Sequence, residues 1–222
     1  MSLTFGLLCF PGVQQLDLTG PYEVFASVPN SSTHLLWKDL QPIRSATGLI
    51  LTPDTTLTDA PDFDVLCIPG GAGTNALLTD TEILSFIRNK ASKARYVTSV
   101  CTGALVLGQA GLLSGKRATT HWNALDFLPH FGASIVKERV VQDDNIITAG
   151  GITSGIDFAL TLVAELLSQE EAETIQLALE YAPAPPFSAG LPSQARPTII
   201  DSARQRMEAA RLERHTILHG DT

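Results

Sequence analysis

The segment Arg95-Tyr-Val-Thr-Ser-Val-Cys101-Thr-Gly-Ala-Leu-Val-Leu-Gly-Gln-Ala-Gly-Leu-Leu113 indicates the fold class. Its β-branched start is typical of a buried strand, and the apolar positions after Gly103 have helical spacing. Strand, tight turn and helix follow one another with Cys101 at the corner, as in a nucleophile elbow. Free N–H groups of a first helical turn stabilise anions, so we expect the Cys101 thiol to ionise more easily than a free thiol. The alternative is a buried cysteine that acts as a small hydrophobic residue; the small residues Thr102 and Gly103 argue against it because they keep the corner open.

Length and composition suit one large α/β domain. The chain has 222 residues, of which 44% are hydrophobic and 17% charged, so a substantial core is possible. The formal net charge of −8 argues against a nucleic-acid-binding surface, which needs clustered Lys and Arg. No charged-then-apolar signal peptide opens the chain, no apolar run reaches a membrane-spanning length, and the three cysteines cannot all pair. We therefore expect a cytoplasmic, soluble protein with reduced thiols and no membrane contact.

Strand-like and helix-like segments alternate along the chain. The expected strands are residues 3–10, 33–37, 43–51 (with a turn at Thr47-Gly48), 64–68, 96–100, 117–120, 139–141 and 146–148. The last two are expected to pair as a hairpin across Asp143-Asp144-Asn145. The expected helices are residues 22–28, 81–90 (capped by Asp80), 122–131, 154–167 and 169–181 (capped by Ser168). Pro21 suits the first turn of the first of these helices, where its missing N–H is not needed. Many of the strands are apolar throughout, which predicts a mostly parallel central sheet with helices on both faces.

The carboxyl ends of the strands carry the chemically distinctive residues. These are Asp17, the glycine-rich loop 70–73, Cys101, His121 and the pair Gly150-Gly151. Functional loops of open parallel sheets lie at this edge, so we expect these residues to converge there.

The C-terminal part has a different composition. Residues 183–197 are rich in Pro, Ala, Gly and Ser and predict irregular structure, and an amphipathic helix is expected from Thr198 to about Arg214. We interpret residues 1–190 as the α/β domain and residues 191–222 as a linker and helix that packs on this body or on a partner. The apolar side chains of that helix need burial, which favours a homodimer.

Five pieces of sequence together resemble the PfpI/ThiJ superfamily of class I glutamine-amidotransferase-like proteins and, more narrowly, the isonitrile (isocyanide) hydratases. They are residues 10–25 (Phe-Pro-Gly-Val-Gln-Gln-Leu-Asp-Leu-Thr-Gly-Pro-Tyr-Glu-Val-Phe), Ile68-Pro-Gly-Gly71, Ser99-Val-Cys-Thr-Gly-Ala104, Ala118-Thr-Thr-His-Trp122 and Thr148-Ala-Gly-Gly-Ile152. Each piece alone is weak, but their ordered combination over residues 3–190 is specific. The resemblance implies a flavodoxin-like α/β sandwich, usually dimeric.

Asp17 follows the first expected strand. Many members of the superfamily have glutamate at this site, and the shorter aspartate resembles the isonitrile hydratases and the sensor domains of related transcription regulators. A poorly solvated carboxyl close to a thiolate has a raised pKa, stays protonated and donates to sulfur. Alternatively, Asp17 has a structural role and caps a helix that begins near Leu18.

The remaining candidate residues surround these two. Gly71, Ala72 and the amide of Thr102 are expected to bind developing negative charge, although a plain strand-to-helix turn is compatible with the same glycines. Gly150 and Ile152 are expected to line the pocket for a small-molecule substrate.

His121 stands where many relatives have a histidine near the thiol, as a base or as an orienting structural residue. Cys9 and Cys67 read as core residues. No metal-ligand motif is present, and neither a metal nor an organic cofactor is expected.

The resemblance implies hydration of an isonitrile to an N-substituted formamide through a Cys101 thioimidate, with Asp17 as general acid. Three alternatives stay open: another hydrolase or glyoxalase-like enzyme of the superfamily, a non-enzymatic ligand sensor, and an oxidation sensor that uses Cys101. Only 32 residues follow Gly190, and the overall charge is acidic; both argue against the sensor, because related regulators carry an additional helix-turn-helix region after the sensor domain.

Overall fold

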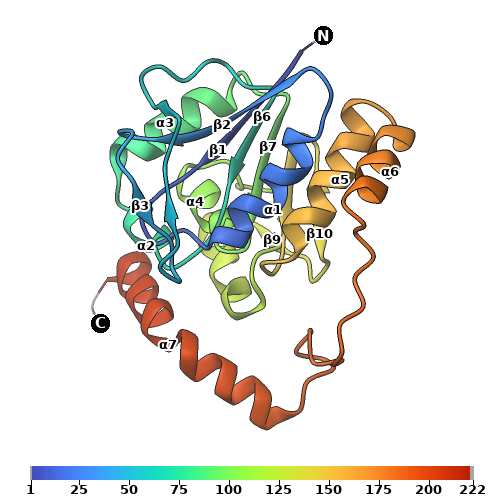
Figure 1. Cartoon of the computed structure of the whole chain (residues 1–222). Helices are drawn as coiled ribbons and strands as arrows, with labels where there is room; N and C mark the ends of the chain where they lie inside the picture. Colours follow the sequence, from blue (N-terminus) through green and yellow to red (C-terminus); the bar gives the residue numbers. More distant parts are fainter. Residues whose placement is uncertain (1, 221–222) are drawn as a thin grey trace.

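A seven-stranded sheet forms the centre of the molecule (Figure 1). The computed structural model describes residues 2–220. The strand order is β10-β11-β7-β6-β1-β2-β5, and every neighbouring pair is parallel except β10 and β11. The strands are β1 (Leu3–Leu8), β2 (Ser31–Trp37), β5 (Thr55–Thr56), β6 (Val65–Ile68), β7 (Tyr96–Val100), β10 (Val140–Asp143) and β11 (Ile146–Ala149). The predicted mostly parallel sheet is confirmed.

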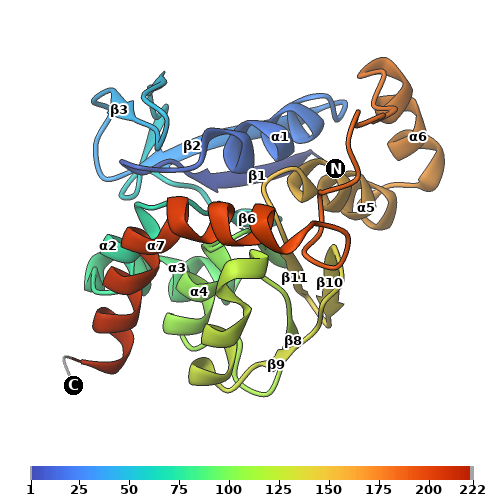
Figure 2. The ribbon, with the colours of Figure 1, turned by 90° about the horizontal axis from the view of Figure 1, so that it is seen from below.

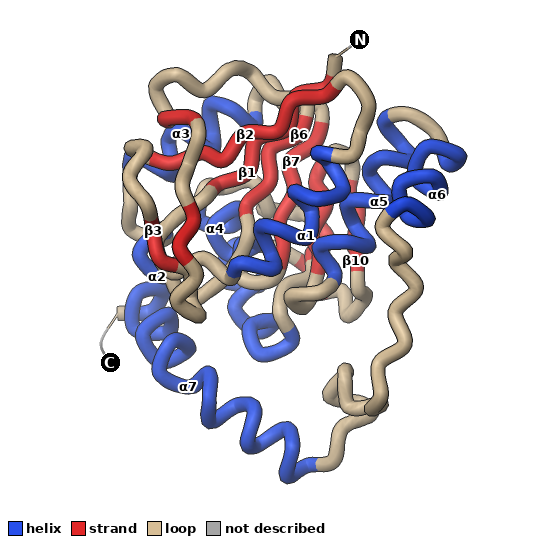
Figure 3. The backbone as a smooth tube through the Cα atoms, in the orientation of Figure 1, coloured by secondary structure: helices blue, strands red, loops and turns tan. Residues whose placement is uncertain are grey.

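Helices cover both faces of this sheet, α1 and α5 on one side and α3 and α4 on the other (Figures 1, 2 and 3). The helices are α1 (Gln15–Ala26), α2 (Thr74–Leu77), α3 (Thr81–Ala91), α4 (Gly103–Gln109), the 3-10 helix η1 (Trp122–Phe131), α5 (Ser154–Leu166), α6 (Gln169–Ala178) and α7 (Pro197–His219). Two small sheets join β3 (Ile43–Arg44) to β4 (Ile50–Leu51) and β8 (Arg117–Ala118) to β9 (Ser134–Ile135). Flavodoxin-like architecture follows from these layers.

The core joins the central strands to α1 and α5 through stacked aromatic rings. Phe5 of β1 and Phe25 of α1 stack with centroids 4.4 Å apart, and Phe158 of α5 meets Phe25 edge-on at 6.0 Å. All three side chains are fully buried. Rings of this size contribute several kcal/mol each through burial, so they fix the position of α1 against the sheet.

The caps and the hairpin expected from the sequence are confirmed. The side chain of Asp80 accepts a hydrogen bond from the Ile83 N–H, and the side chain of Ser168 accepts one from the Glu171 N–H. The antiparallel pair β10–β11 turns at the expected acidic segment.

The start of the first helix was predicted wrongly. We expected Pro21 in the first helical turn, but α1 begins at Gln15 and contains Pro21 in its interior. Proline has no N–H to bond the carbonyl four residues back, that of Asp17. Tertiary packing overrides this loss: a Cβ on Gly155 of α5 would lie only 3.0 Å from Pro21 Cδ, so the ring fits closely against that helix. The correction matters because Asp17 lies within the first turn of α1 and is not its cap.

The strands and the turn expected over residues 43–51 are present as the short hairpin β3–β4, with the turn at residues 46–48. The helix expected over 122–131 is a 3-10 helix. The C-terminal helix α7 is longer than expected. After an irregular linker it passes across the carboxyl edge of the sheet, where it contacts α2 and η1 (Figures 1 and 2). Within residues 2–220, no helix is both long and apolar enough to cross a membrane.

Candidate active site

Cys101 occupies a strained corner between β7 and α4. Its φ angle is +54°, in the left-handed region that residues with a Cβ rarely adopt. Two hydrogen bonds hold the corner: the Cys101 N–H donates to the Ala149 carbonyl at 3.0 Å, and the Thr120 hydroxyl donates to the Cys101 carbonyl at 2.6 Å. The predicted elbow is therefore present, with the thiol at the carboxyl edge of the sheet and only 6% exposed.

Three groups of the predicted site converge on Gly70. A Cβ built on Gly70 would lie 2.6 Å from the Thr102 nitrogen, 2.7 Å from Asp17 Oδ2 and 2.8 Å from Cys101 Cβ. No real Cβ tolerates such distances to backbone and buried atoms, so only glycine allows these groups to approach. The structure brings Asp17, Cys101 and Thr102 together, as the sequence predicts. Within the loop 70–73, Gly70 is the residue that permits this approach, although the sequence did not distinguish it from the other residues of the loop.

The carboxyl of Asp17 is fully buried and partly unsatisfied. Oδ2 accepts a hydrogen bond from the Gly70 N–H at 2.9 Å, while Oδ1 has no partner among the described residues. Burial raises the pKa of Asp17 to about 7, against the opposing influence of the Gly70 N–H and of the neighbouring Cys101. Around neutral pH a proton is therefore available on this carboxyl, which fits the expected donor.

Contrary to the expectation from the sequence, the position of Cys101 at the corner does not by itself lower the pKa of its thiol. Burial raises the pKa of the thiol well above its usual value, and a negative charge on Asp17 raises it further. The Thr102 amide and hydroxyl and the positive charge of Arg214 act in the opposite direction. The helix amides favour the thiolate, but the removal of sulfur from water outweighs them. The thiol ionises more easily when Asp17 is protonated than when it is charged, so the two groups titrate as a pair.

The glycine-rich loop between β6 and α2 holds Thr102. Gly71 has a φ of +125°, and a Cβ there would lie 2.4 Å from the Gln14 nitrogen. The Gly71 N–H donates to Thr102 Oγ1 at 3.0 Å, and the Thr74 hydroxyl donates to the same oxygen at 3.2 Å. The described contact of the Gly71 N–H is thus with the Thr102 side chain. Ala72 lies exposed in the same loop. Their role in binding negative charge stays a prediction.

His121 has a structural contact rather than a bond to the thiol. Its Nδ1 accepts a hydrogen bond from the Asn123 N–H at 3.3 Å, as the cap of η1, and its ring lies beside Trp122. Burial, together with the positive charge of Arg214, lowers the pKa of His121 to about 4. Among the described residues no hydrogen bond joins His121 to Cys101, and a neutral ring does not favour a thiolate by charge.

Gly150 follows the residue that accepts the Cys101 N–H bond, which places it at the corner. A Cβ there would lie 3.6 Å from the Arg139 carbonyl oxygen and 3.7 Å from that of Thr120, ordinary contacts. The backbone therefore does not require glycine at 150. Ile152 is half-buried on the same turn, and the expectation that both line the pocket stays a prediction.

Arg214 is a residue near the site that the sequence analysis missed. It belongs to α7, is only 5% exposed, and lies with its guanidinium carbon 5.8 Å from the centre of the Phe127 ring. No local motif marks it, because it is separated from Cys101 by more than a hundred residues and reaches the site only through the path of the C-terminal chain.

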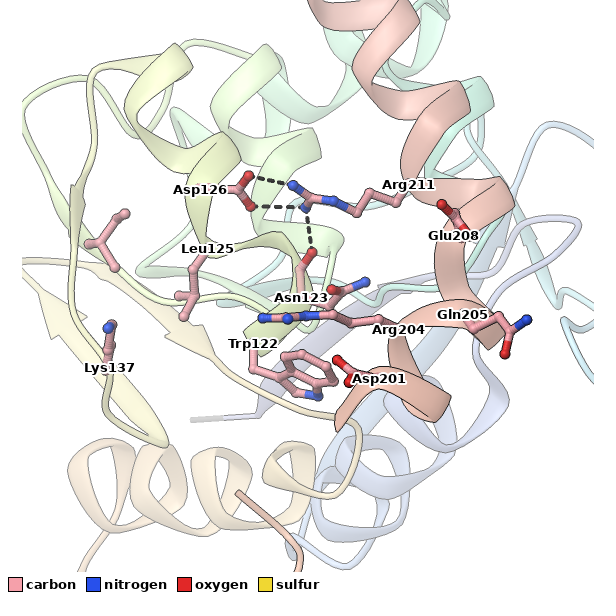
Figure 4. A pocket seen from close by; sticks show the side chains of 11 residues that line it. Trp122, Asn123, Leu125, Asp126, Lys137, Asp201, Arg204, Gln205, Glu208 and Arg211 are labelled. Carbon is pink, nitrogen blue, oxygen red and sulfur yellow. Dashed lines mark hydrogen bonds and ion pairs between the residues drawn. The ribbon is translucent and has the colours of Figure 1, made fainter. Parts of the chain in front are cut away.

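A cleft of about 670 Å³ opens between η1 and α7 (Figure 4). It is lined by Trp122, Asn123, Leu125, Asp126, Ile135, Lys137, Asp201, Arg204, Gln205, Glu208 and Arg211. One side is closed by the Arg211 guanidinium, which binds the Asp126 carboxylate and the Asn123 carbonyl. Within residues 2–220, no cluster of three or more His, Cys, Asp or Glu side chains could hold a metal ion.

Comparison with known proteins gives concordant results. The sequence model of the DJ-1/PfpI family matches residues 5–165. A protein of Pseudomonas putida named isonitrile hydratase is 60% identical over 206 residues, which cover 93% of this chain and 90% of the relative. The crystal structure of a ThiJ/PfpI family protein from Pseudomonas syringae superposes with a TM-score of 0.95 at 39% identity, covering 99% of this chain and 91% of that one. Drosophila melanogaster DJ-1beta shares the fold, with a TM-score of 0.74 at 24% identity over 82% of this chain and all of that one.

Proposed function

The chain belongs to the DJ-1/PfpI family, and from that premise we propose that it is an isonitrile hydratase that converts an isonitrile and water to an N-substituted formamide. The high identity with the isonitrile hydratase of Pseudomonas putida supports this assignment. The structural observation that carries it is the convergence of Asp17, Cys101 and the Thr102 amide on Gly70. A nucleophile, a proton donor and an anion-binding amide are the groups that addition to a carbon–nitrogen multiple bond requires.

In the first step the Cys101 thiolate attacks the terminal carbon of the isonitrile and forms a carbon–sulfur bond. The proton held by Asp17 passes to that same carbon, which leaves a thioimidate on sulfur and a carboxylate on Asp17. The free Oδ1 of Asp17 is a buried atom without a partner, so a proton there is not engaged by any described group. The pKa of about 7 keeps this proton available at neutral pH.

In the second step water adds to the thioimidate carbon, with its hydroxyl on carbon and one proton on nitrogen. The Asp17 carboxylate then takes the hydroxyl proton while the carbon–sulfur bond breaks, which releases the formamide and restores both the thiolate and the protonated carboxyl. The Thr102 amide stabilises the departing sulfur, since it already acts to lower the pKa of Cys101. Every step uses side chains and amides of this chain.

Incubation with one aliphatic and one aromatic isonitrile tests the proposal. Formamide is followed by infrared spectroscopy or chromatography, and methylglyoxal is assayed in parallel as the substrate of a glyoxalase-like alternative. We expect formamide from the wild-type protein and none above background from Cys101→Ala. Full turnover by Cys101→Ala, or consumption of methylglyoxal alone, would contradict the assignment.

We also propose that the protein forms a homodimer. Large apolar side chains remain exposed on α6 and the following linker, with Leu177 80% and Phe187 81% exposed, and a second copy of the chain would cover them. A cytoplasmic location also remains a prediction; all three cysteines are unpaired in the structure, as reducing conditions require. Light scattering coupled to size-exclusion chromatography measures the assembly, and a monomeric mass would contradict the dimer.

A further inference from the structure

The helix α7 places a buried positive charge among the segments that border Cys101. Arg214 lies on the inner side of α7, where it is the one fully buried residue among those described for this helix. Its guanidinium packs against Phe127, and its charge acts on both the Cys101 thiol and the His121 ring. Arg214 therefore belongs to the surroundings of the site although it comes from the far end of the chain.

Arg214 lacks the partners that a buried arginine normally has. Among residues 2–220 its Nε has no hydrogen-bond partner, and no carboxylate forms an ion pair with it. Arg211, one turn earlier, is by contrast bound to the Asp126 carboxylate. A buried charge without compensation costs several kcal/mol, so an anion near Arg214 is expected to offset this cost.

Three groups whose charges act on Arg214 can be negative. Burial lowers the pKa of Arg214, and a negative Cys101 is the strongest of the charges that oppose this change, ahead of Glu213 and Asp126; the charge of Arg211 adds to the decrease. Neither carboxylate forms an ion pair with Arg214: Asp126 is bound to Arg211, and Glu213 accepts from the Asn75 amide. Cys101 is the third of these groups, and a negative charge on its sulfur favours the charged form of Arg214.

Segments that border the site hold α7 in this place. The Asn75 amide, in α2 just after the glycine-rich loop, donates to the Ala210 carbonyl and to Glu213, both at 2.8 Å. On the other side Arg211 binds Asp126 and the Asn123 carbonyl of η1, which begins directly after His121. The position of Arg214 is thus coupled to the same two segments that shape the surroundings of Cys101.

We propose that Arg214 is a positioning residue of the active site, whose guanidinium stabilises the Cys101 thiolate, and that α7 is the element that delivers it. The proposal rests on the proposed function in that Cys101 is the nucleophile, but the ionisation of Cys101 can be measured without any isonitrile. Loss of isonitrile turnover and loss of this electrostatic coupling are therefore separate results.

The first experiment measures the pH dependence of Cys101 alkylation by iodoacetamide, with peptide mass spectrometry to separate it from Cys9 and Cys67. In Arg214→Met we expect the apparent pKa of Cys101 to rise by about one unit, so that alkylation at neutral pH slows about tenfold. Arg214→Lys keeps the charge and restores most of the rate. The matched control is Arg206→Met, which removes an exposed positive charge from the same helix and leaves the profile unchanged.

Three results would overturn the proposal: a wild-type profile in Arg214→Met or in the second neutral variant, Arg214→Gln; an equal shift in Arg206→Met; or no recovery in Arg214→Lys. Circular dichroism of each variant establishes that it is folded.

A second experiment does not alter Arg214. If the thiolate and Arg214 stabilise each other, release of α7 becomes less favourable as Cys101 ionises. Trypsin can cleave after the buried Arg214 only when α7 detaches from the rest of the protein. We therefore measure the rate of this cleavage in wild-type protein and in Cys101→Ser at each pH. The ratio of the two rates cancels the pH dependence of trypsin itself. We expect the ratio of the variant rate to the wild-type rate to increase with pH through the titration of the thiol. A constant ratio would overturn the proposal even if the neutral Arg214 variants did not fold.

Discussion

Asp17 and Cys101 come from two different elements and both crowd the position that a side chain on Gly70 would occupy. A Cβ on this residue would lie 2.7 Å from Asp17 Oδ2 and 2.8 Å from Cys101 Cβ. The carboxyl comes from the first turn of α1 and the thiol from the end of β7, so Gly70 sets how close acid and nucleophile can be. This contact yields the first prediction.

Gly70→Ala is expected to lower kcat/KM for isonitrile hydration by on the order of 100-fold, because the backbone or the carboxyl must move by a large fraction of an ångström. The matched control is Gly151→Ala, where a Cβ would meet nothing within 4 Å. Steady-state kinetics of both variants measure the effect. Equal activity of the two variants would show that the separation of Asp17 and Cys101 does not control the reaction.

Asp17→Asn should stabilise the fold, and more strongly at high pH than at low pH. The pKa of Asp17 is about 7 in the folded protein, against an ordinary value of 3.8, so the folded state binds more protons between these values and stability falls as pH rises across this range. The full loss is roughly 4 kcal/mol, and asparagine does not incur it. Urea unfolding at about pH 4.5 and pH 8 measures the difference, which should be larger at pH 8. A pH-independent difference would contradict the raised pKa.

The pair of Asp17 and Cys101 should determine the acid limb of the rate profile. The reactive form, a thiolate beside a protonated carboxyl, carries one proton fewer than the fully protonated pair, so kcat/KM increases as pH rises through about 7 and decreases only where the pair loses its second proton, at the raised pKa of the thiol. Asp17→Asn removes the donor, so activity should drop by on the order of 100-fold or more, and what remains should lack this acid limb. Rate measurements from about pH 5 to pH 9 provide the comparison. Unchanged turnover in Asp17→Asn would remove Asp17 as the acid.

His121→Asn is expected to retain turnover within a few-fold. Asparagine can replace the histidine Nδ1 as the cap that accepts the Asn123 N–H bond, and the ring, whose pKa is lowered to about 4, is neutral at working pH. His121→Leu, which lacks the cap, should cost about 1 kcal/mol of stability. A loss of activity of on the order of 100-fold in His121→Asn would instead identify His121 as a catalytic base.

The sequence predicted what depends on local pattern. Residues 96–104 carried the strand, the corner and the helix start, and the caps at Asp80 and Ser168 followed from side-chain chemistry one turn away. Parallel topology then placed Asp17 with Cys101, because the carboxyl ends of parallel strands share one edge and β1 and β7 lie on either side of β6. These inferences needed no knowledge of distant contacts.

What the sequence did not predict depends on tertiary packing. Pro21 lies inside α1 because its ring packs against Gly155, a contact that no local rule contains. The pKa of Cys101 is raised because the surrounding chain removes its water, which outweighs the helix amides that the local pattern revealed. Arg214 reaches the site only because α7 returns across the sheet edge after an irregular linker, so nothing near residue 214 signals it.

The strained corner at Cys101 gives the last prediction. The Thr120 hydroxyl donates to the Cys101 carbonyl at 2.6 Å and so holds the residue in its left-handed conformation. Thr120→Val keeps the shape but leaves a buried carbonyl without this donor, which costs about 1–3 kcal/mol, and it allows the thiol to move away from Asp17. The neighbour Thr119 is equally buried, and its hydroxyl makes no hydrogen bond among the described residues, so Thr119→Val is the matched control. Thermal unfolding and kcat of the two variants are the measurements. We expect Thr120→Val to lose both stability and turnover while Thr119→Val retains them; two equally affected variants would mean that the corner does not depend on this hydroxyl.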